Sequence, residues 1–279
     1  MSSDSIKAQT IDLLGEIPTI RRARGYRLYD NGGKRYLDLY QNGGCSLLGH
    51  RAGRLSTVLK DTISKGLIFD LPSIYHHRLQ RALSEMYPAF ETFPLYASST
   101  EALDLISSIK GESFVSGMIS DPAKGEYGEV CYDRPFLPPE AHGCTGQVRI
   151  LLPILPFRIG DAPVVVCLRE PDHADRPVQR PLSPVLLAGL LRAIHDLKRF
   201  ETPPWFKTGF LDGAYGWIQR GPYITPRFDF RIYPEVFDEF RNRGILLSPS
   251  PGLPSILPGE ASEGEIEKMI RLFKQFPGK

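Results

Sequence analysis

The sequence lacks the features that mark membrane and exported proteins. Its 279 residues contain no run of about eighteen apolar residues, so we expect no membrane-spanning helix. Residues 1–6 carry neither a basic nor an apolar signal region, which predicts a protein that is not exported by a standard signal. The cysteines show no paired spacing: Cys45, Cys131, Cys144 and Cys167. We therefore expect a soluble, cytoplasmic protein with reduced thiols.

An excess of charge of one sign is also absent. Lys and Arg number 34 and Asp and Glu number 32, which leaves a formal net charge of +2. Nucleic acids and anionic membranes bind proteins through clustered positive charge, and the basic clusters at 21–24 and 51–54 are short. The composition therefore predicts neither a nucleic-acid partner nor a membrane partner.

Motifs of several other chemistries are missing. Cys131, His142 and Cys144 do not have the spacing of a zinc site. His76 and His77 are neighbours in a predicted helix and would point to different faces of it. The sequence has no Gly-x-Ser-x-Gly elbow, no Walker-type loop and no strand-anchored Gly-x-Gly-x-x-Gly. We therefore expect no metal site.

The hydrophobic pattern that is present predicts an α/β chain. Apolar residues at helical spacing predict helices over 5–14, 55–66, 73–87, 98–109, 184–199, 234–243 and 263–276. Residues 26–40 predict a hairpin, 93–97 a short strand and 162–169 a buried strand. Residues 110–146 and 201–226 are rich in Gly and Pro and receive no assignment. The strand, turn and helix over 93–109 are typical of half an α/β unit.

Four motifs carry a family resemblance. The first is Gly25-x-x-Leu28-Tyr29-Asp30-x-x-Gly33-Lys34-Arg35-Tyr36-Leu37-Asp38, followed by Gly43 and Leu48-Gly49-His50. The others are Ser98-Ser99-Thr100-Glu101-Ala102-x-Asp104, an apolar run from Val164 to Glu170-Pro171, and the stretch 235–276. In this order the motifs resemble the class III pyridoxal-phosphate-dependent aminotransferases of the ornithine, acetylornithine and glutamate-1-semialdehyde type. His50 itself is expected to satisfy a backbone carbonyl.

The resemblance implies a fold, a cofactor and an assembly. The fold class is α/β of the pyridoxal-phosphate-dependent transferase type I kind, with a reduced large-domain sheet and a small domain from both chain ends. Residues 1–70 and 231–279 would form the small domain, and residues 71–230 the large one. Pyridoxal phosphate becomes a possible cofactor. The family forms homodimers, so we expect loop 42–50 and the helix from Leu55 to contact a second subunit.

The resemblance also assigns site residues. Ser98, Ser99 and Thr100 match the place where the family holds the cofactor's phosphate, at a helix N-terminus whose free N–H groups and dipole attract anions. The alternative is a capping box, Ser98-x-x-Glu101, which starts a helix without a ligand. Ser99 stands where the family has glycine. Glu170 would lie near the substrate entrance, or it is an ordinary surface carboxylate.

Two residues that the family's chemistry requires have no clear match downstream of Glu170. The family has an acid that keeps the pyridine nitrogen protonated, in an Asp-Glu pair ending a strand, and a lysine one strand later. Lys207 is the only lysine between Lys198 and Lys268, and it follows the preceding helix too soon. This pattern favours deletion of central strands and lost or altered transamination. Three alternatives stay open: an active enzyme that uses Lys207, a non-catalytic protein that binds a phosphorylated small molecule, and a dimeric regulatory protein without a ligand.

Overall fold

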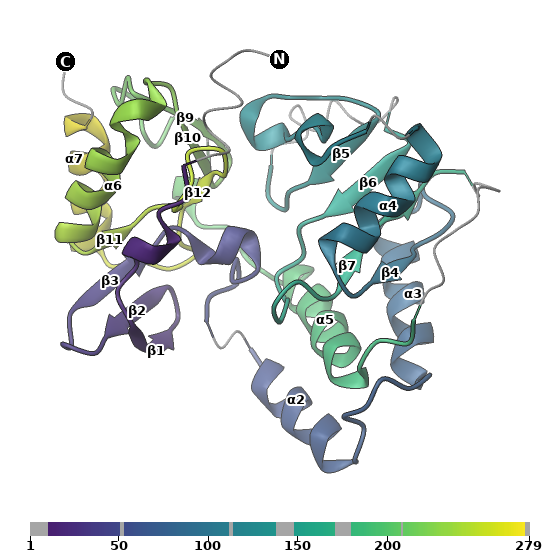
Figure 1. Ribbon diagram of the computed structural model, residues 1–279. Coiled ribbons are helices and arrows are strands. Elements are labelled where there is room, and N and C mark those ends of the chain that lie inside the picture. The colour runs from purple at the N-terminus through teal and green to yellow at the C-terminus, as the bar shows by residue number, and fades with distance from the viewer. Residues whose placement is uncertain are drawn as a thin grey trace. The chain divides into compact units, whose positions relative to one another are not determined.

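The computed structural model describes residues 11–50, 53–111, 114–137, 148–170, 180–207 and 209–276 (Figure 1). The chain folds into two compact units. The terminal unit comprises residues 1–51, 136–138 and 201–279, and the central unit comprises residues 52–135 and 139–200. Both ends of the chain thus belong to one unit. The predicted small domain included residues 52–70, and these residues lie in the central compact unit. The division into a small and a large domain stays a prediction.

The first sheet of the terminal unit has the strand order β1-β2-β3-β11. Its first three strands are antiparallel neighbours: β1 (Ile20–Arg24), β2 (Arg27–Asp30) and β3 (Arg35–Asp38). β11 (Ile245–Leu246) runs parallel to β3, so strands from the two ends of the chain pair with each other. The turn between β2 and β3 contains Gly33 at φ 84°, a backbone conformation that glycine adopts easily. The hairpin predicted over 26–40 is confirmed.

The second sheet of the terminal unit has the order β12-β10-β9. β9 (Trp217–Arg220) and β10 (Tyr223–Pro226) form a hairpin, and β12 (Ser255–Ile256) pairs with β10. The sequence pattern assigned no strand to this region, because Gly221 and Pro222 interrupt the apolar run. The structure shows that these two residues form the hairpin turn, in which Gly221 has φ 55°.

Two helices complete the terminal unit, α6 (Tyr233–Asn242) and α7 (Glu263–Gln275). Their aromatic side chains meet the ring of Trp217 on β9. The ring centroids of Trp217 and Phe273 lie 5.0 Å apart, as do those of Phe240 and Phe273. Such edge-on and tilted aromatic contacts stabilise a core beyond the burial of apolar area. α7 begins at a capping box in which Ser262 and Glu265 bind each other's backbone N–H groups, so its predicted start is confirmed.

The described residues of the central unit form the α-helices α2 (Leu55–Ser64), α3 (Ile74–Met86), α4 (Ser99–Lys110) and α5 (Pro184–Leu197). α5 packs against both α2 and α3. Its buried residues include Leu187, Leu190 and Ile194, which the helical period had placed on one face. α4 contributes Leu105 and Ile106 to a core that the strands of this unit complete.

The strands of the central unit are short and pair in two groups. β4 (Leu95–Tyr96) is antiparallel to β7 (Val164–Val165). β5 (Val130–Asp133) is parallel to β6 (Ile150–Pro153), and β6 is antiparallel to β8 (Cys167–Leu168). The single strand predicted over 162–169 is therefore two strands with different partners. β5 lies in a region to which the sequence pattern assigned no strand.

The remaining regular segments are single turns of 3-10 helix: Leu14–Glu16, Gln41–Gly44, Ser116–Met118, Pro122–Lys124, Pro204–Phe206 and Phe230–Ile232. Most of the helix predicted over 5–14 lies outside the described residues. None of the helices in the described part of the chain is long and apolar enough to cross a membrane.

Candidate functional site

The N-terminus of α4 is built from Ser98 and its neighbours. The hydroxyl of Ser98 accepts a hydrogen bond from the N–H of Glu101 (3.2 Å), and the carboxylate of Glu101 accepts one from the N–H of Ala97 (3.0 Å). The N–H of Ser99 donates to a carboxylate oxygen of Asp161 at 3.2 Å. The helix start thus satisfies three backbone donors with groups of this chain. Of the capping box considered for Ser98 and Glu101, the hydrogen bond to the Ser98 hydroxyl is present, whereas Glu101 accepts from the N–H of Ala97 and not from that of Ser98.

Asp161 reaches this helix through the pairing of β4 with β7. Leu95 lies opposite Val165 and Tyr96 opposite Val164. The segment that precedes β7 therefore passes the N-terminus of α4, which follows β4, and the carboxylate of Asp161 lies 3.2 Å from the N–H of Ser99. A tight turn closed by hydrogen bonds between Ile159 and Ala162 presents the carboxylate. This contact could not be expected from the sequence, because the two residues are 62 positions apart.

This arrangement does not fit a cofactor phosphate. A phosphate at a helix N-terminus needs free N–H donors, and those of Ser99 and Glu101 are already engaged. The carboxylates of Asp161 and Glu101 also stand at this point, and a dianion brought beside two carboxylates is repelled by both. Thr100 is exposed and adds no cation. The N–H groups of Ser99 and Glu101 lie where the family holds the phosphate, but in this chain they donate to its own side chains.

An acidic residue that sequence reasoning missed ends strand β5. Asp133 lies at the carboxyl end of β5, opposite Pro153 of the parallel strand β6. Its carboxylate accepts a hydrogen bond of 2.7 Å from the phenol of Tyr87. Burial, with a smaller contribution from the charge of Asp133, raises the pKa of the Cys167 thiol well above its ordinary value. A thiol in that state is a weak nucleophile, so Cys167 is a packing residue.

Lys207 belongs to the terminal unit, whereas Ser98, Ser99, Thr100 and Asp133 belong to the central unit. It ends the short turn Pro204–Phe206 and its side chain is exposed. Its backbone carbonyl accepts a hydrogen bond from the side-chain amide of Gln219 at 3.0 Å. The structure thus places the backbone of Lys207 against β9, in a unit that contains none of the other residues predicted to bind the cofactor.

Glu170 follows β8 and is exposed. Because β8 runs antiparallel to β6, its end lies beside the beginning of β6, where Arg149 approaches the Glu170 carboxylate at 3.5 Å. Asp133 ends β5, which runs parallel to β6, so Glu170 and Asp133 lie at opposite ends of this three-stranded sheet. Pro171 lies outside the described residues. A substrate role for Glu170 stays a prediction.

The glycine loop after the first motif is held by a carboxylate. Asp38, which is buried, accepts hydrogen bonds from the N–H groups of Tyr40 and Gln41, each at 2.9 Å. Its second oxygen lies 2.8 Å from Nε2 of His50. The partner of the His50 ring is thus a carboxylate, not the backbone carbonyl expected from the sequence. Through these contacts, Asp38 holds Tyr40 and Gln41 at the start of the loop and His50 at its end.

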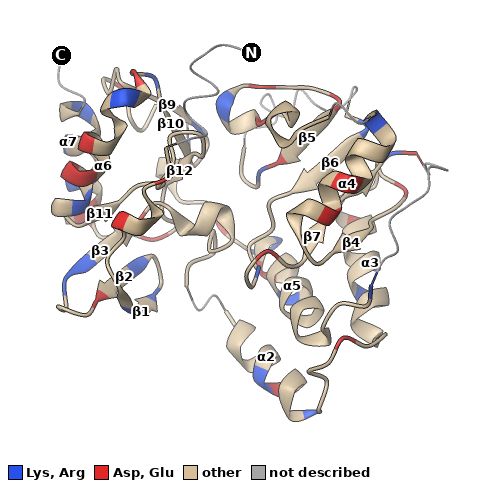
Figure 2. Cartoon of the chain, in the orientation of Figure 1, with Lys and Arg blue, Asp and Glu red and all other residues tan. Residues whose placement is uncertain are grey.

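No group of three or more potential metal ligands occurs among the described residues, and His142 and Cys144 lie outside them. In Figure 2, basic and acidic residues alternate along the described helices and strands.

Comparison with known proteins places this chain beside uncharacterised relatives. No protein-family model matches it. An uncharacterised protein of Borreliella burgdorferi is 25% identical over 94% of this chain and 92% of its own length. An uncharacterised protein of Treponema pallidum is 29% identical over 91% of this chain and 93% of its own length. Glutamate-1-semialdehyde 2,1-aminomutase of Desulforamulus reducens is 34% identical, over 30% of this chain and 20% of the enzyme.

Solved structures similar to this chain are aminotransferases. An omega-transaminase from Sphaerobacter thermophilus matches with a TM-score of 0.68 and 12% identity, over 95% of this chain and 92% of that one. Ornithine aminotransferase from Plasmodium yoelii matches with a TM-score of 0.66 and 10% identity, over 92% and 93%. A glutamate-1-semialdehyde aminomutase from Pseudomonas aeruginosa matches with 0.63 and 13%, over 92% and 86%. The chain therefore has the α/β fold of the pyridoxal-phosphate-dependent aminotransferases.

Proposed function

We propose that this protein has the aminotransferase fold but does not catalyse transamination. In that reaction pyridoxal phosphate acts as the electron sink, and the protein must supply a lysine, an acid for the ring nitrogen and a phosphate site. The proposal rests on the lysine above all. The acid also has no match downstream of Glu170, and the hydrogen bonds at the α4 N-terminus bear on the phosphate site.

The carrying observation is that the strands of the central unit have no lysine. The sequence contains none between Lys124 and Lys198, a stretch that includes β5, β6, β7 and β8. The resemblance puts both the acid and the lysine downstream of Glu170. There the sequence has no apolar strand that ends in an Asp-Glu pair, and Lys207 is the only lysine between Lys198 and Lys268. Without a lysine amine, neither the covalent link to the cofactor nor the proton transfer has a carrier.

The competing function is an active enzyme that uses Lys207. It requires Lys207, the only lysine between Lys198 and Lys268, to serve a cofactor held by the central unit. It also requires the α4 N-terminus to release the carboxylates of Asp161 and Glu101. The non-catalytic function keeps these contacts.

The test is covalent trapping. The purified protein is incubated with pyridoxal phosphate, reduced with borohydride and mapped by mass spectrometry, with Lys207→Ala and Lys60→Ala as parallel samples. Lys60 is an exposed lysine on α2 and reports random modification. We expect substoichiometric labelling spread over exposed lysines, with Lys207 no more labelled than Lys60. A stoichiometric adduct at Lys207, with turnover of an amino donor that disappears in Lys207→Ala, would show that the enzyme is active.

A further inference from the structure

We infer that Asp161 is the resident anion of the α4 N-terminus and that it closes this place to an external phosphate. The inference deepens the proposed function, since a closed phosphate site is one way in which the fold loses its cofactor. Its geometry is independent of the missing lysine. The two ideas can therefore fail separately.

Three backbone N–H groups at and just before the start of helix α4 have side-chain acceptors within this chain. The N–H groups of Ala97, Ser99 and Glu101 bind Glu101, Asp161 and Ser98 side chains respectively, at 3.0 to 3.2 Å. The N-terminus of a helix carries roughly half a positive charge. With the carboxylates of Glu101 and Asp161 beside it, that partial charge is already neutralised. An arriving phosphate would have to displace Asp161 and tolerate Glu101.

The position of Asp161 is imposed by backbone pairing and not by a flexible side chain alone. β7 pairs with β4, which leads into α4, and the mutual hydrogen bonds of Ile159 and Ala162 close the turn that contains Asp161. Gly160 occupies the turn at φ 61°, where other residues are strained. Arg158 lies 3.7 Å from the other Asp161 oxygen and balances its charge. The carboxylate is thus positioned from both sides.

Replacement of Asp161 should open the site. In Asp161→Ala the N–H of Ser99 loses its acceptor, and Arg158 loses its anionic neighbour. We expect a melting temperature about 1–4 °C lower than wild type, the range for one charge at a helix end in a chain of this size. Inorganic phosphate at constant ionic strength should restore that loss in Asp161→Ala, and its affinity for the variant should exceed that for wild type by about tenfold or more.

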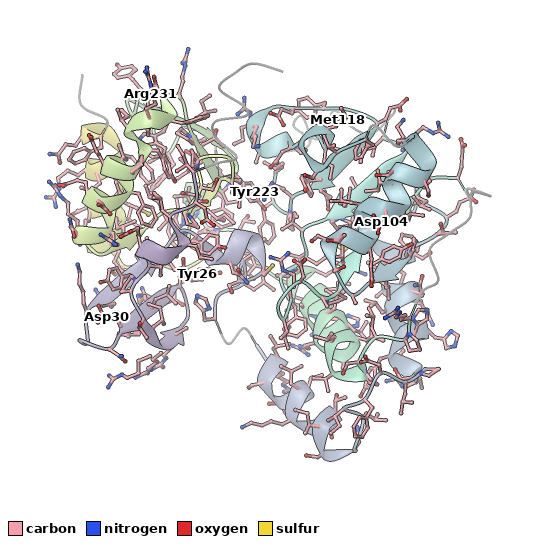
Figure 3. All side chains as sticks on the ribbon, in the orientation of Figure 1. Tyr26, Asp30, Asp104, Met118, Tyr223 and Arg231 are labelled. Atoms are coloured by element: carbon pink, nitrogen blue, oxygen red, sulfur yellow. The ribbon has the colours of Figure 1, made fainter. Side chains whose placement is uncertain are left out.

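The control is Asp104→Asn, which removes a carboxylate charge from α4 itself, away from the helix N-terminus (Figure 3). It should leave the response to phosphate as in wild type. A second measurement follows the backbone N–H of Ser99 by ¹⁵N-resolved NMR. That signal should shift in Asp161→Asn and stay in place in Asp104→Asn, whatever the effect of either substitution on stability.

Three outcomes would overturn the inference. Wild type stabilised by phosphate as strongly as Asp161→Ala would show that Asp161 does not close the site. No phosphate response in Asp161→Ala would show that the helix start is no anion site at all. An unmoved Ser99 signal in Asp161→Asn would show that the contact is absent in solution. A reducible adduct at Lys207 with none of these results would instead count against the proposed function alone.

Discussion

Arg27 and Glu265 join the first hairpin to the last helix of the chain within the terminal unit. Nε and Nη2 of Arg27 donate to the two carboxylate oxygens of Glu265 at 2.9 and 2.6 Å. Burial raises the pKa of this carboxyl, but the donors from Arg27 and Ser262 outweigh it and bring the pKa to about 2. A two-pronged pair of this kind fixes geometry as well as charge.

Because the pKa of Glu265 is lower in the folded state, the pair stabilises the fold above the carboxyl's ordinary pKa of 4.5. The stabilisation is lost as the pH falls from about 4.5 towards 2. We expect Glu265→Gln to lower the free energy of unfolding by about 1.5–3 kcal/mol at pH 7, the range for hydrogen bonds to charged groups. Urea unfolding should show this difference shrink as the pH is lowered to 3.

Glu263→Gln is the control for this prediction, since Glu263 is exposed in the same first turn of α7. It should cost at most a few tenths of a kcal/mol at both pH values, as surface substitutions do. An equal effect of the two substitutions, or a Glu265→Gln effect that does not change with pH, would mean that Arg27 does not hold the carboxylate in solution.

At the scale of elements, α5 depends on a glycine at its buried face. Gly189 is buried, and a Cβ built there would overlap the ring of Phe157. We expect Gly189→Ala to destabilise the protein by about 1–3 kcal/mol, because overpacking forces ring or helix to move. Chemical denaturation measures this cost. Phe157→Leu in the same chain should recover part of it, so that the double variant is more stable than the sum of the single costs.

Gly264→Ala provides the contrasting case. Gly264 lies in the first turn of α7, and a Cβ there would meet nothing within 4 Å. The same chemical change should therefore stabilise the protein by about 0.4–1 kcal/mol, because alanine restricts the unfolded chain more than glycine does. If both glycine substitutions destabilised the fold equally, contact with Phe157 would not be the reason for the Gly189 effect.

Helices and strands differed in how far the sequence predicted them. α5 and α7 were found because their apolar residues recur at helical spacing and their starts carry Pro184 and the Ser262 cap. β5 and the β9–β10 hairpin were missed. Each of these strands has only four residues, and neighbouring Gly and Pro hide the alternation that identifies a strand.

At the scale of the whole molecule, the resemblance predicts a homodimer. In the central unit, exposed apolar side chains gather on the end of α2, the following loop and the start of α3: Ile63, Ile68, Phe69, Leu71 and Ile74. Each exposes about half or more of its surface, and Phe69 exposes 67%. Apolar groups clustered in this way mark interaction surfaces more often than single exposed residues do.

We expect the wild-type protein to sediment as a dimer at micromolar concentration and Phe69→Asp to sediment as a monomer, because a buried, unpaired charge at an interface is costly. Tyr215→Asp, an equally drastic change at an exposed aromatic residue of the terminal unit, should remain dimeric. A monomeric wild type would show that the family's assembly does not extend to this chain.

The sequence by itself determined the order of the motifs, the amphipathic helices, the first hairpin and the absence of a lysine between Lys124 and Lys198. These properties depend on residues close together in the chain or on composition alone. The role of Ser98 and Ser99, in contrast, could not be determined from the sequence alone. A capping box and a phosphate site use the same residues, so local sequence predicts both equally.

Only the tertiary structure shows the contact of Asp161 with the N–H of Ser99, because it depends on the pairing of β4 with a strand some seventy residues later. The tertiary structure likewise places Asp133 opposite Pro153 of β6 in the central unit. It places Lys207 in the terminal unit, which contains neither Asp133 nor Asp161. Strand partners are chosen by the burial of whole faces across long loops. The local sequence pattern of a single segment therefore does not determine its partner strand.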